Sequence, residues 1–139
     1  MGTNYFLHSP ACPHCGKEDE PLHLGKSSGG WCFGLHVYPE KGLNDWQDIW
    51  EMLHASIEEN DHEIKNEYGD IVQLAEFFTI VWDRKALRAK PLDSELDRKW
   101  LETNHAIPGP FGLARHALYP GHCIGHGEGP FDFIIGEFS

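Results

Sequence analysis

Two short stretches of this chain carry the residue types that bind metal ions. Cys-Pro-His-Cys-Gly occupies residues 12–16, and Cys-Ile-Gly-His-Gly occupies residues 123–127. In each stretch two residues separate the two ligands, a spacing at which one tight turn can aim both side chains at a zinc ion. One pair supplies only half of a tetrahedron, so a closed structural site needs both. The predicted ligands of a structural Zn²⁺ are Cys12, Cys15, Cys123 and His126.

The two pairs lie near opposite ends of the chain, much farther apart than the ligand pairs of a zinc finger. An ion shared by both pairs would therefore join the two ends of a whole domain. A thioredoxin-like dithiol is disfavoured, because the polar residues 17–21 follow the first pair where that motif needs a helix. A different ligand set is also open, in which another residue replaces a predicted ligand. The candidates are His23, Cys32, His36 and His122.

Residues 22–37 predict a β-hairpin, because two alternating runs flank Ser-Ser-Gly-Gly. One face of the hairpin is apolar and suits a core. The opposite face combines imidazoles and a thiol with glycines, which often mark close approach by a ligand or another backbone. Its residues are His23, Gly25, Cys32, Gly34 and His36.

Three interpretations of this second face remain open. His23, Cys32 and His36 could ligate a metal, or the face could simply pack beneath the zinc-binding turn. It could also line a pocket for a small phosphorylated or nucleotide-like ligand. The ligand-binding residues would then be His23, Lys26, Ser27, Ser28 and His36.

The remaining sequence predicts a single α+β domain covering residues 1–139. Apolar residues at helical spacing predict helices over residues 44–60 and 71–84, and a third that begins at residue 94. Asn44 and Ser94 are the predicted N-caps of the first and third helices. The predicted strands outside the hairpin cover residues 4–7, 62–68, 113–119 and 131–138.

Composition narrows the class of protein further. No apolar run reaches the length of a membrane span and no secretory signal pattern opens the chain, so we expect a cytoplasmic protein without membrane contact. In a reducing cytoplasm the four cysteines suit metal binding better than disulfides.

The net charge of −11 repels nucleic acid and favours a partner protein with a basic surface. The alternative explanation is that the negative charge only keeps a small protein soluble.

An enzymatic alternative comes from the C-terminal histidines. His116, His122 and His126 lie close in sequence to Glu128, and a catalytic zinc keeps an open position beside such a base. A zinc deaminase is excluded, because the required Pro-Cys-x-x-Cys is missing and the motif order is reversed. A different metal-dependent hydrolase remains the alternative.

Five motifs of the chain are Gly2-Thr3-Asn4-Tyr5, Cys12-Pro13-His14-Cys15-Gly16, Leu24-Gly25-Lys26-Ser27-Ser28-Gly29-Gly30-Trp31, Leu35-His36-Val37 and His126-Gly127-Glu128-Gly129. Together they resemble those of small uncharacterised proteins carried by bacteriophages and prophages. The resemblance spans most of the chain and implies a phage context, but no established activity. Small acidic phage proteins often resemble inhibitors of host defence, anti-CRISPR proteins among them, and this step is an analogy.

The leading functional hypothesis is therefore a non-enzymatic, zinc-stabilised phage protein that binds and inhibits a host factor. Its acidic surface would meet a basic groove on that factor. The second hypothesis is a binder of a phosphorylated or nucleotide-like ligand on the hairpin face, and the third is the metal-dependent hydrolase.

Overall fold

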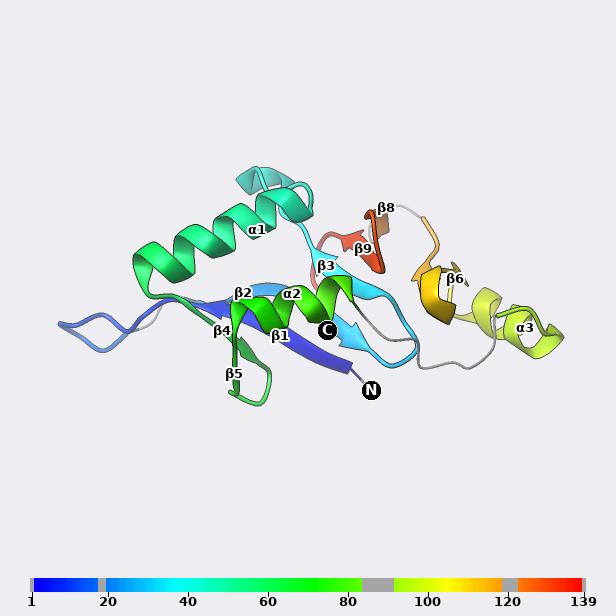
Figure 1. Ribbon diagram of the computed structural model, residues 1–139, viewed down its shortest axis with the longest axis horizontal. Helices are drawn as coiled ribbons and strands as arrows, with labels where there is room; N and C mark the ends of the chain where they lie inside the picture. Colours follow the sequence, from blue (N-terminus) through cyan, green and yellow to red (C-terminus); the bar gives the residue numbers. More distant parts are fainter. Residues whose placement is uncertain (1, 18–19, 84–91, 119–122, 139) are drawn as a thin grey trace.

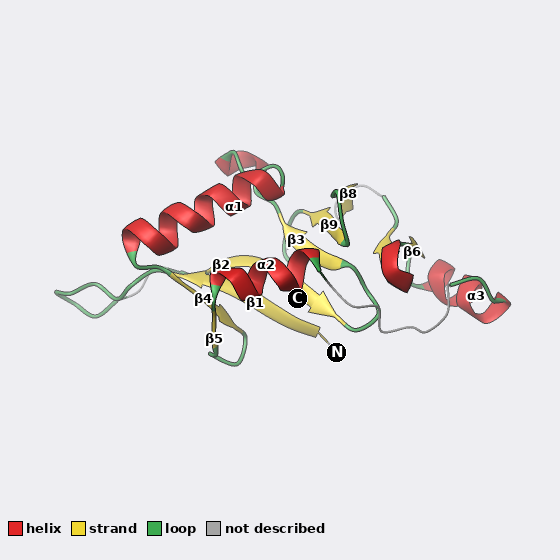
Figure 2. Cartoon of the chain, viewed as in Figure 1, coloured by secondary structure: helices red, strands yellow, loops and turns green. Residues whose placement is uncertain are grey.

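The computed structural model describes residues 2–17, 20–83, 92–118 and 123–138, and its elements confirm the predicted α+β class (Figures 1 and 2). The strands are β1 (Gly2–His8), β2 (Leu22–Ser28), β3 (Phe33–His36), β4 (Glu63–Asn66), β5 (Ile71–Val72), β6 (Ala106–Pro108), β7 (Ala114–His116), β8 (Cys123–His126) and β9 (Phe131–Ile134). The α-helices are α1 (Trp46–His54), α2 (Leu74–Trp82) and α3 (Glu95–Thr103). Short 3₁₀ turns cover Pro39–Lys41 and Pro110–Gly112, and a π-helical turn covers Ala55–Glu59.

Within the described residues, seven strands form one sheet in the order β5-β4-β1-β2-β3-β9-β8. All neighbours pair antiparallel except β3 and β9, which pair in parallel. The predicted hairpin is confirmed, because β2 and β3 pair directly across the turn between them. The C-terminal strand β9 thus lies beside the N-terminal hairpin, and β8 forms the outer edge.

A β-bulge in β2 changes which residues share a face of the hairpin. Tyr5 pairs with Gly25 but Phe6 pairs with His23, so Leu24 is the extra residue. Gly25 has a φ of +152°, and a Cβ there would collide with the carbonyl oxygen of Gly34. Only glycine suits this position, because both the backbone angle and the close strand contact exclude a side chain.

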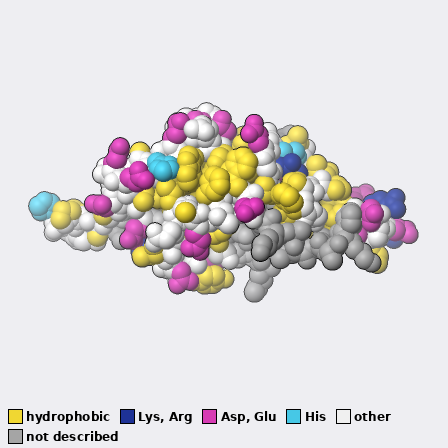
Figure 3. Space-filling view, in the orientation of Figure 1, with side chains coloured by type: hydrophobic (Ala, Val, Ile, Leu, Met, Phe, Trp, Pro, Cys, Tyr) yellow, Lys and Arg dark blue, Asp and Glu magenta, His cyan; other side chains and the backbone are white. Residues whose placement is uncertain are grey.

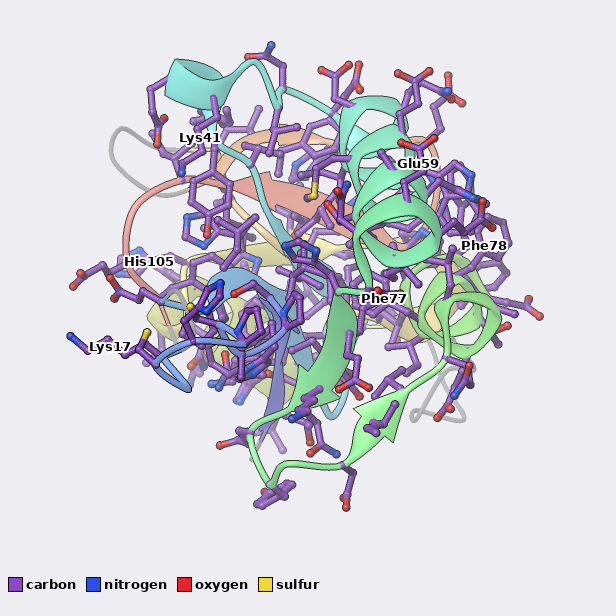
Figure 4. The ribbon with its side chains drawn as sticks, turned by 90° about the vertical axis from the view of Figure 1, so that its left-hand side faces the viewer. Lys17, Lys41, Glu59, Phe77, Phe78 and His105 are labelled. Carbon is purple, nitrogen blue, oxygen red and sulfur yellow. The ribbon has the colours of Figure 1, made fainter. Side chains whose placement is uncertain are left out.

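Helices α1 and α2 cover the sheet and share one hydrophobic core with it. Figure 4 shows Phe77 directed towards the sheet and Phe78 directed away from it, and their exposed fractions are 0% and 40%. The apolar face predicted for the hairpin is confirmed in this core. Its fully buried members include Leu24, Phe33, Leu35, Ile49, Leu53, Phe77 and Val81.

A smaller unit of α3, β6 and β7 packs around its own apolar cluster. Trp31 packs against this cluster, and the backbone N–H of Cys32 donates to the carbonyl of Ala114 over 2.8 Å. The backbone N–H of Ala114 donates in turn to the carbonyl of Gly30 over 2.7 Å. The turn after β2 therefore ties β7 to the main sheet.

The helix boundaries differ in part from the predictions. Asp45, not Asn44, caps α1, and its side chain accepts a hydrogen bond from the backbone N–H of Asp48. Helix α2 begins at Leu74 rather than residue 71, because Ile71 and Val72 pair with β4 as strand β5. The cap at Ser94 is confirmed, with a reciprocal capping box formed by Asp97.

The strands predicted over residues 113–119 and 131–138 are shorter in the structure, where β7 and β9 end at His116 and Ile134. Among the described residues, no helix has the length and apolar character needed to cross a membrane.

Candidate metal centre around Asp132

A wholly buried carboxylate, Asp132 in the middle of β9, organises the candidate site. Its Oδ1 accepts hydrogen bonds from Arg115 Nε at 3.0 Å and His126 Nδ1 at 2.7 Å. Its Oδ2 accepts hydrogen bonds from the backbone N–H of His116 at 2.9 Å and from His116 Nδ1 at 3.0 Å. One side chain thus joins β7, β8 and β9, and with them the two sheets.

A bulge in β8 places both ligands of the second sequence pair on one side. Residues three apart in a regular strand point to opposite faces. Here Cys123 pairs with Ile134 and His126 pairs with Asp132, so β8 carries one more residue than β9 between these positions. Since Asp132 and Ile134 share a face of β9, Cys123 and His126 share the same face of β8.

Cys123, His126 and Asp132 together can hold a metal ion. Each offers one ligand atom, and these atoms all lie within 4.8 Å of one another. The sulfur of Cys123 lies 4.0 Å from Nδ1 of His126. A zinc ion bonded to such atoms holds neighbouring ligands about 3.3–3.5 Å apart. Small movements of these side chains would therefore bring the three atoms to bonding positions.

Burial and hydrogen bonding set the protonation of this group. Burial acts to raise the pKa of Asp132, but hydrogen bonds from His116 and His126 outweigh it and the pKa is lowered. Asp132 is therefore ionised, and an ion that binds it must displace one of the hydrogen bonds that its two oxygens accept. Burial raises the pKa of the Cys123 thiol, so a metal ion that binds there must displace its proton.

Arg115 holds the carboxylate and the following loop in place. Its Nε donates to Asp132, and its Nη2 donates to three backbone carbonyls. The side chain is 16% exposed, so the ion pair is largely removed from water. The carbonyls belong to Gly127, Gly129 and Phe131, at 3.4, 2.9 and 2.8 Å.

Cys12 and Cys15 do not join this group, which corrects the prediction of one shared zinc ion. They lie in the loop between β1 and β2, at the far left of Figure 1, whereas β8 lies to the right of centre. Two strands separate β2 from β8 in the sheet, a distance of about 14 Å at the usual strand spacing. Each of the two predicted ligand pairs has the spacing that a zinc ion needs, but the pairs lie in different parts of the fold.

The sequence interpretation missed Asp132, Arg115 and the bulge, although it singled out Cys123 and His126. One feature of the sequence could have indicated Asp132. It is the single charged residue within the apolar run Phe131-Asp132-Phe133-Ile134-Ile135. A carboxylate in such a strand is buried on one of its faces and needs a partner there.

The predicted ligand-binding residues of the hairpin divide between two cavities. Lys26 and Ser28 line one of ≈ 270 Å³, together with Trp31 and His116. His23 and His36 line a more open one of ≈ 540 Å³. Ser27 lines neither of these two cavities. The Gly25 bulge explains why Ser27 lines neither cavity, because beyond the bulge Lys26 and Ser28 share the face of His23 and Ser27 turns to the other face.

His23 and His36 form a neutral, hydrogen-bonded pair. Their Nδ1 atoms lie 2.9 Å apart, and Nε2 of His23 lies 2.8 Å from Oδ1 of Asn4. Burial and, to a smaller degree, the neighbouring His36 and Lys26 lower the pKa of His23 to about 4. Burial also lowers the pKa of His36. Both ring nitrogens of His23 thus have partners within the protein, which supports the packing interpretation for His23.

The interpretation of His23, Cys32 and His36 as metal ligands is not supported. In the part of the chain that the structure describes, Cys123, His126 and Asp132 form the one group of three or more side chains that could hold an ion. Cys32 is buried beside Gly109, and His36 stacks on Tyr38 with ring centroids 4.1 Å apart. His122, another candidate ligand, lies outside the described residues.

Comparison with models of known protein families, with curated proteins and with solved structures found no match. The resemblance to phage proteins, and the inhibition of a host factor that it implies, therefore stay predictions.

Proposed function

We propose that this protein binds a zinc ion through Cys123, His126 and Asp132. The supporting observation is the convergence of three different ligand atoms from two paired strands within 4.8 Å. A thiolate and an imidazole favour Zn²⁺ over Mg²⁺ or Ca²⁺, which prefer oxygen ligands. The ion would cross-link the edge strand β8 to β9 and stabilise that side of the sheet.

The surroundings of the ligands support this proposal. Arg115 and His116 hold Asp132 in place, whereas an ion bound to Nδ1 of His126 would replace the proton that this atom shares with Asp132. Three protein ligands leave a fourth position, which a water molecule would occupy. His126 also lines a cavity of ≈ 430 Å³ with Trp82 and Glu128, which keeps the metal-dependent hydrolase as an alternative outcome.

Zinc content and thermal stability test this proposal. We expect Cys123→Ser to hold about one Zn²⁺ fewer per chain than the wild type, by elemental analysis of dialysed protein. A chelator should lower the melting temperature of the wild type by more than that of Cys123→Ser. Cobalt substitution should give a sulfur-to-cobalt charge-transfer band that Cys123→Ser weakens.

Cys32→Ser is the matched control, because Cys32 is equally buried but outside the ligand group. It should keep the full zinc content. Equal zinc content in Cys123→Ser and the wild type would contradict the proposal.

A second candidate function is binding of a small phosphorylated ligand in the cavity beside Lys26. This cavity of ≈ 270 Å³ combines a cation, the Ser28 side chain and an aromatic wall. That wall is the pair of Trp31 and His116, whose ring centroids lie 4.7 Å apart. A phosphate would pair with Lys26, and a flat base or ring would stack on the aromatic wall. This arrangement supports the predicted nucleotide-like ligand.

Calorimetric titration with AMP, inorganic phosphate and adenosine tests the second candidate. We expect AMP to bind and Lys26→Met to weaken that binding about tenfold or more, because the charged hydrogen bond is lost. Lys41→Met is the control, since Lys41 lies in the 3₁₀ turn after β3 and should not affect binding. AMP recovered intact supports binding, whereas recovery as adenosine and phosphate supports a hydrolase. No binding of AMP by the wild type would contradict this candidate.

A further inference from the structure

The Cys-Pro-His-Cys-Gly loop forms a closed turn although its cysteines are remote from the Asp132 group. The backbone N–H of Gly16 donates to the carbonyl of Cys12 over 2.8 Å, and the backbone N–H of Cys12 donates to the carbonyl of Lys17 over 2.7 Å. Gly16 has a φ of +74°, which lets the chain turn back directly after Cys15. The loop therefore holds both cysteines on one tight turn.

The two sulfur atoms are arranged as a pair of metal ligands. The Cys12 sulfur accepts hydrogen bonds from the backbone N–H groups of His14 and Cys15, and the Cys15 thiol is also within hydrogen-bonding reach. Both sulfurs therefore lie close together on one turn, as two ligands of one zinc ion must.

The described residues of this turn supply two ligands. Zinc in structural sites takes four, and within the described residues no third His, Cys, Asp or Glu completes a group with Cys12 and Cys15. Cys15 is exposed, and the loop extends beyond the sheet at one end of the molecule (Figures 1 and 3). A second molecule can therefore approach the two sulfurs without meeting the body of the protein.

We propose that two copies of this chain join through these loops, with one Zn²⁺ held by Cys12 and Cys15 of each copy. Four thiolates around one Zn²⁺ leave a local charge of −2. Lys17 lies at the outer edge of the loop in Figure 4, and one from each copy offsets that charge. Contact at the loops alone also keeps apart two bodies that each carry a net charge of −11.

Sedimentation or light scattering of the Cys123→Ser chain tests this inference, because that background lacks the proposed Asp132 zinc site. We expect a monomer in chelator and a dimer when Zn²⁺ is added, with one bound Zn²⁺ for every two chains. Adding Cys12→Ser should abolish both the dimer and the bound zinc. Chelator should return the dimer to monomer, while a reductant that does not bind metal should not.

Parallel measurements keep the inference testable if Cys123→Ser fails to fold. In the otherwise unchanged chain, Cys12→Ser should lose zinc-dependent dimerisation and half a zinc ion per chain, while Cys32→Ser keeps both. Retained zinc-dependent dimerisation in Cys12→Ser would overturn the inference. So would one zinc ion bound at this loop in a monomer, or a dimer broken by reductant but not by chelator. None of these outcomes depends on whether the Asp132 group binds zinc.

Discussion

Replacing Asp132 with alanine is expected to lower the free energy of unfolding by about 3–5 kcal/mol, because it leaves a buried guanidinium without its counterion. Arg115 is only 16% exposed and cannot recover its hydration without rearrangement. His116 and His126 also lose the acceptor of their Nδ1 hydrogen bonds. Urea denaturation in the presence of a chelator measures this effect apart from any bound metal.

Two further substitutions separate charge from packing at this position. Asp132→Asn keeps the shape of the side chain and removes its charge. Its free energy of unfolding should therefore lie between those of the wild type and Asp132→Ala. Asp93→Ala is the surface control, since Asp93 is exposed, and should change stability by less than about 0.5 kcal/mol. A loss below about 1 kcal/mol for Asp132→Ala would show that the Arg115–Asp132 pair does not organise this part of the fold.

Phe33→Ala should be comparably destabilising, by about 3–5 kcal/mol, since it creates a cavity where the sheet meets the helices. Phe33 has an exposed fraction of 0% and lies on β3, at the interior of the seven-stranded sheet. Its ring centroid lies 6.1 Å from that of Tyr5 and 5.7 Å from that of Phe77. Urea denaturation of variant and wild type measures the difference.

A graded series controls this second prediction. Phe33→Leu keeps most of the side-chain volume and should lower the free energy of unfolding by less than Phe33→Ala does. Leu96→Ala removes an apolar side chain that is 80% exposed on α3, and should change stability by less than about 0.5 kcal/mol. Equal losses for Phe33→Ala and Leu96→Ala would contradict the core described here.

Sequence patterns predicted those helices and strands that are specified by residues close together in the sequence. Alternation identified the β2–β3 hairpin, and the apolar spacing of Trp46, Ile49 and Leu53 identified α1. Ser94 and Asp97 predicted the start of α3, because a capping box needs only residues three apart. The same reasoning failed at residue 71, where pairing with β4 outweighs the helical pattern.

Strand order could not be predicted, and the candidate site depends on it. Parallel pairing of β9 with β3 brings the C-terminal strand against the N-terminal hairpin, across most of the chain. Asp132 acquires its partners only after β7, β8 and β9 have come together. The residues next to a carboxylate in a short apolar strand do not indicate which distant side chains will neutralise it.

The sequence by itself determined the ligand chemistry, through two stretches that each hold a pair of metal-binding side chains at close spacing. The tertiary structure decided how these pairs are used. It separates Cys12 and Cys15 from Cys123 and His126, and it adds Asp132 to the second pair. The physical reason is that a turn or a bulge fixes the geometry within a pair, whereas the distance between pairs is set by the order of strands in the sheet.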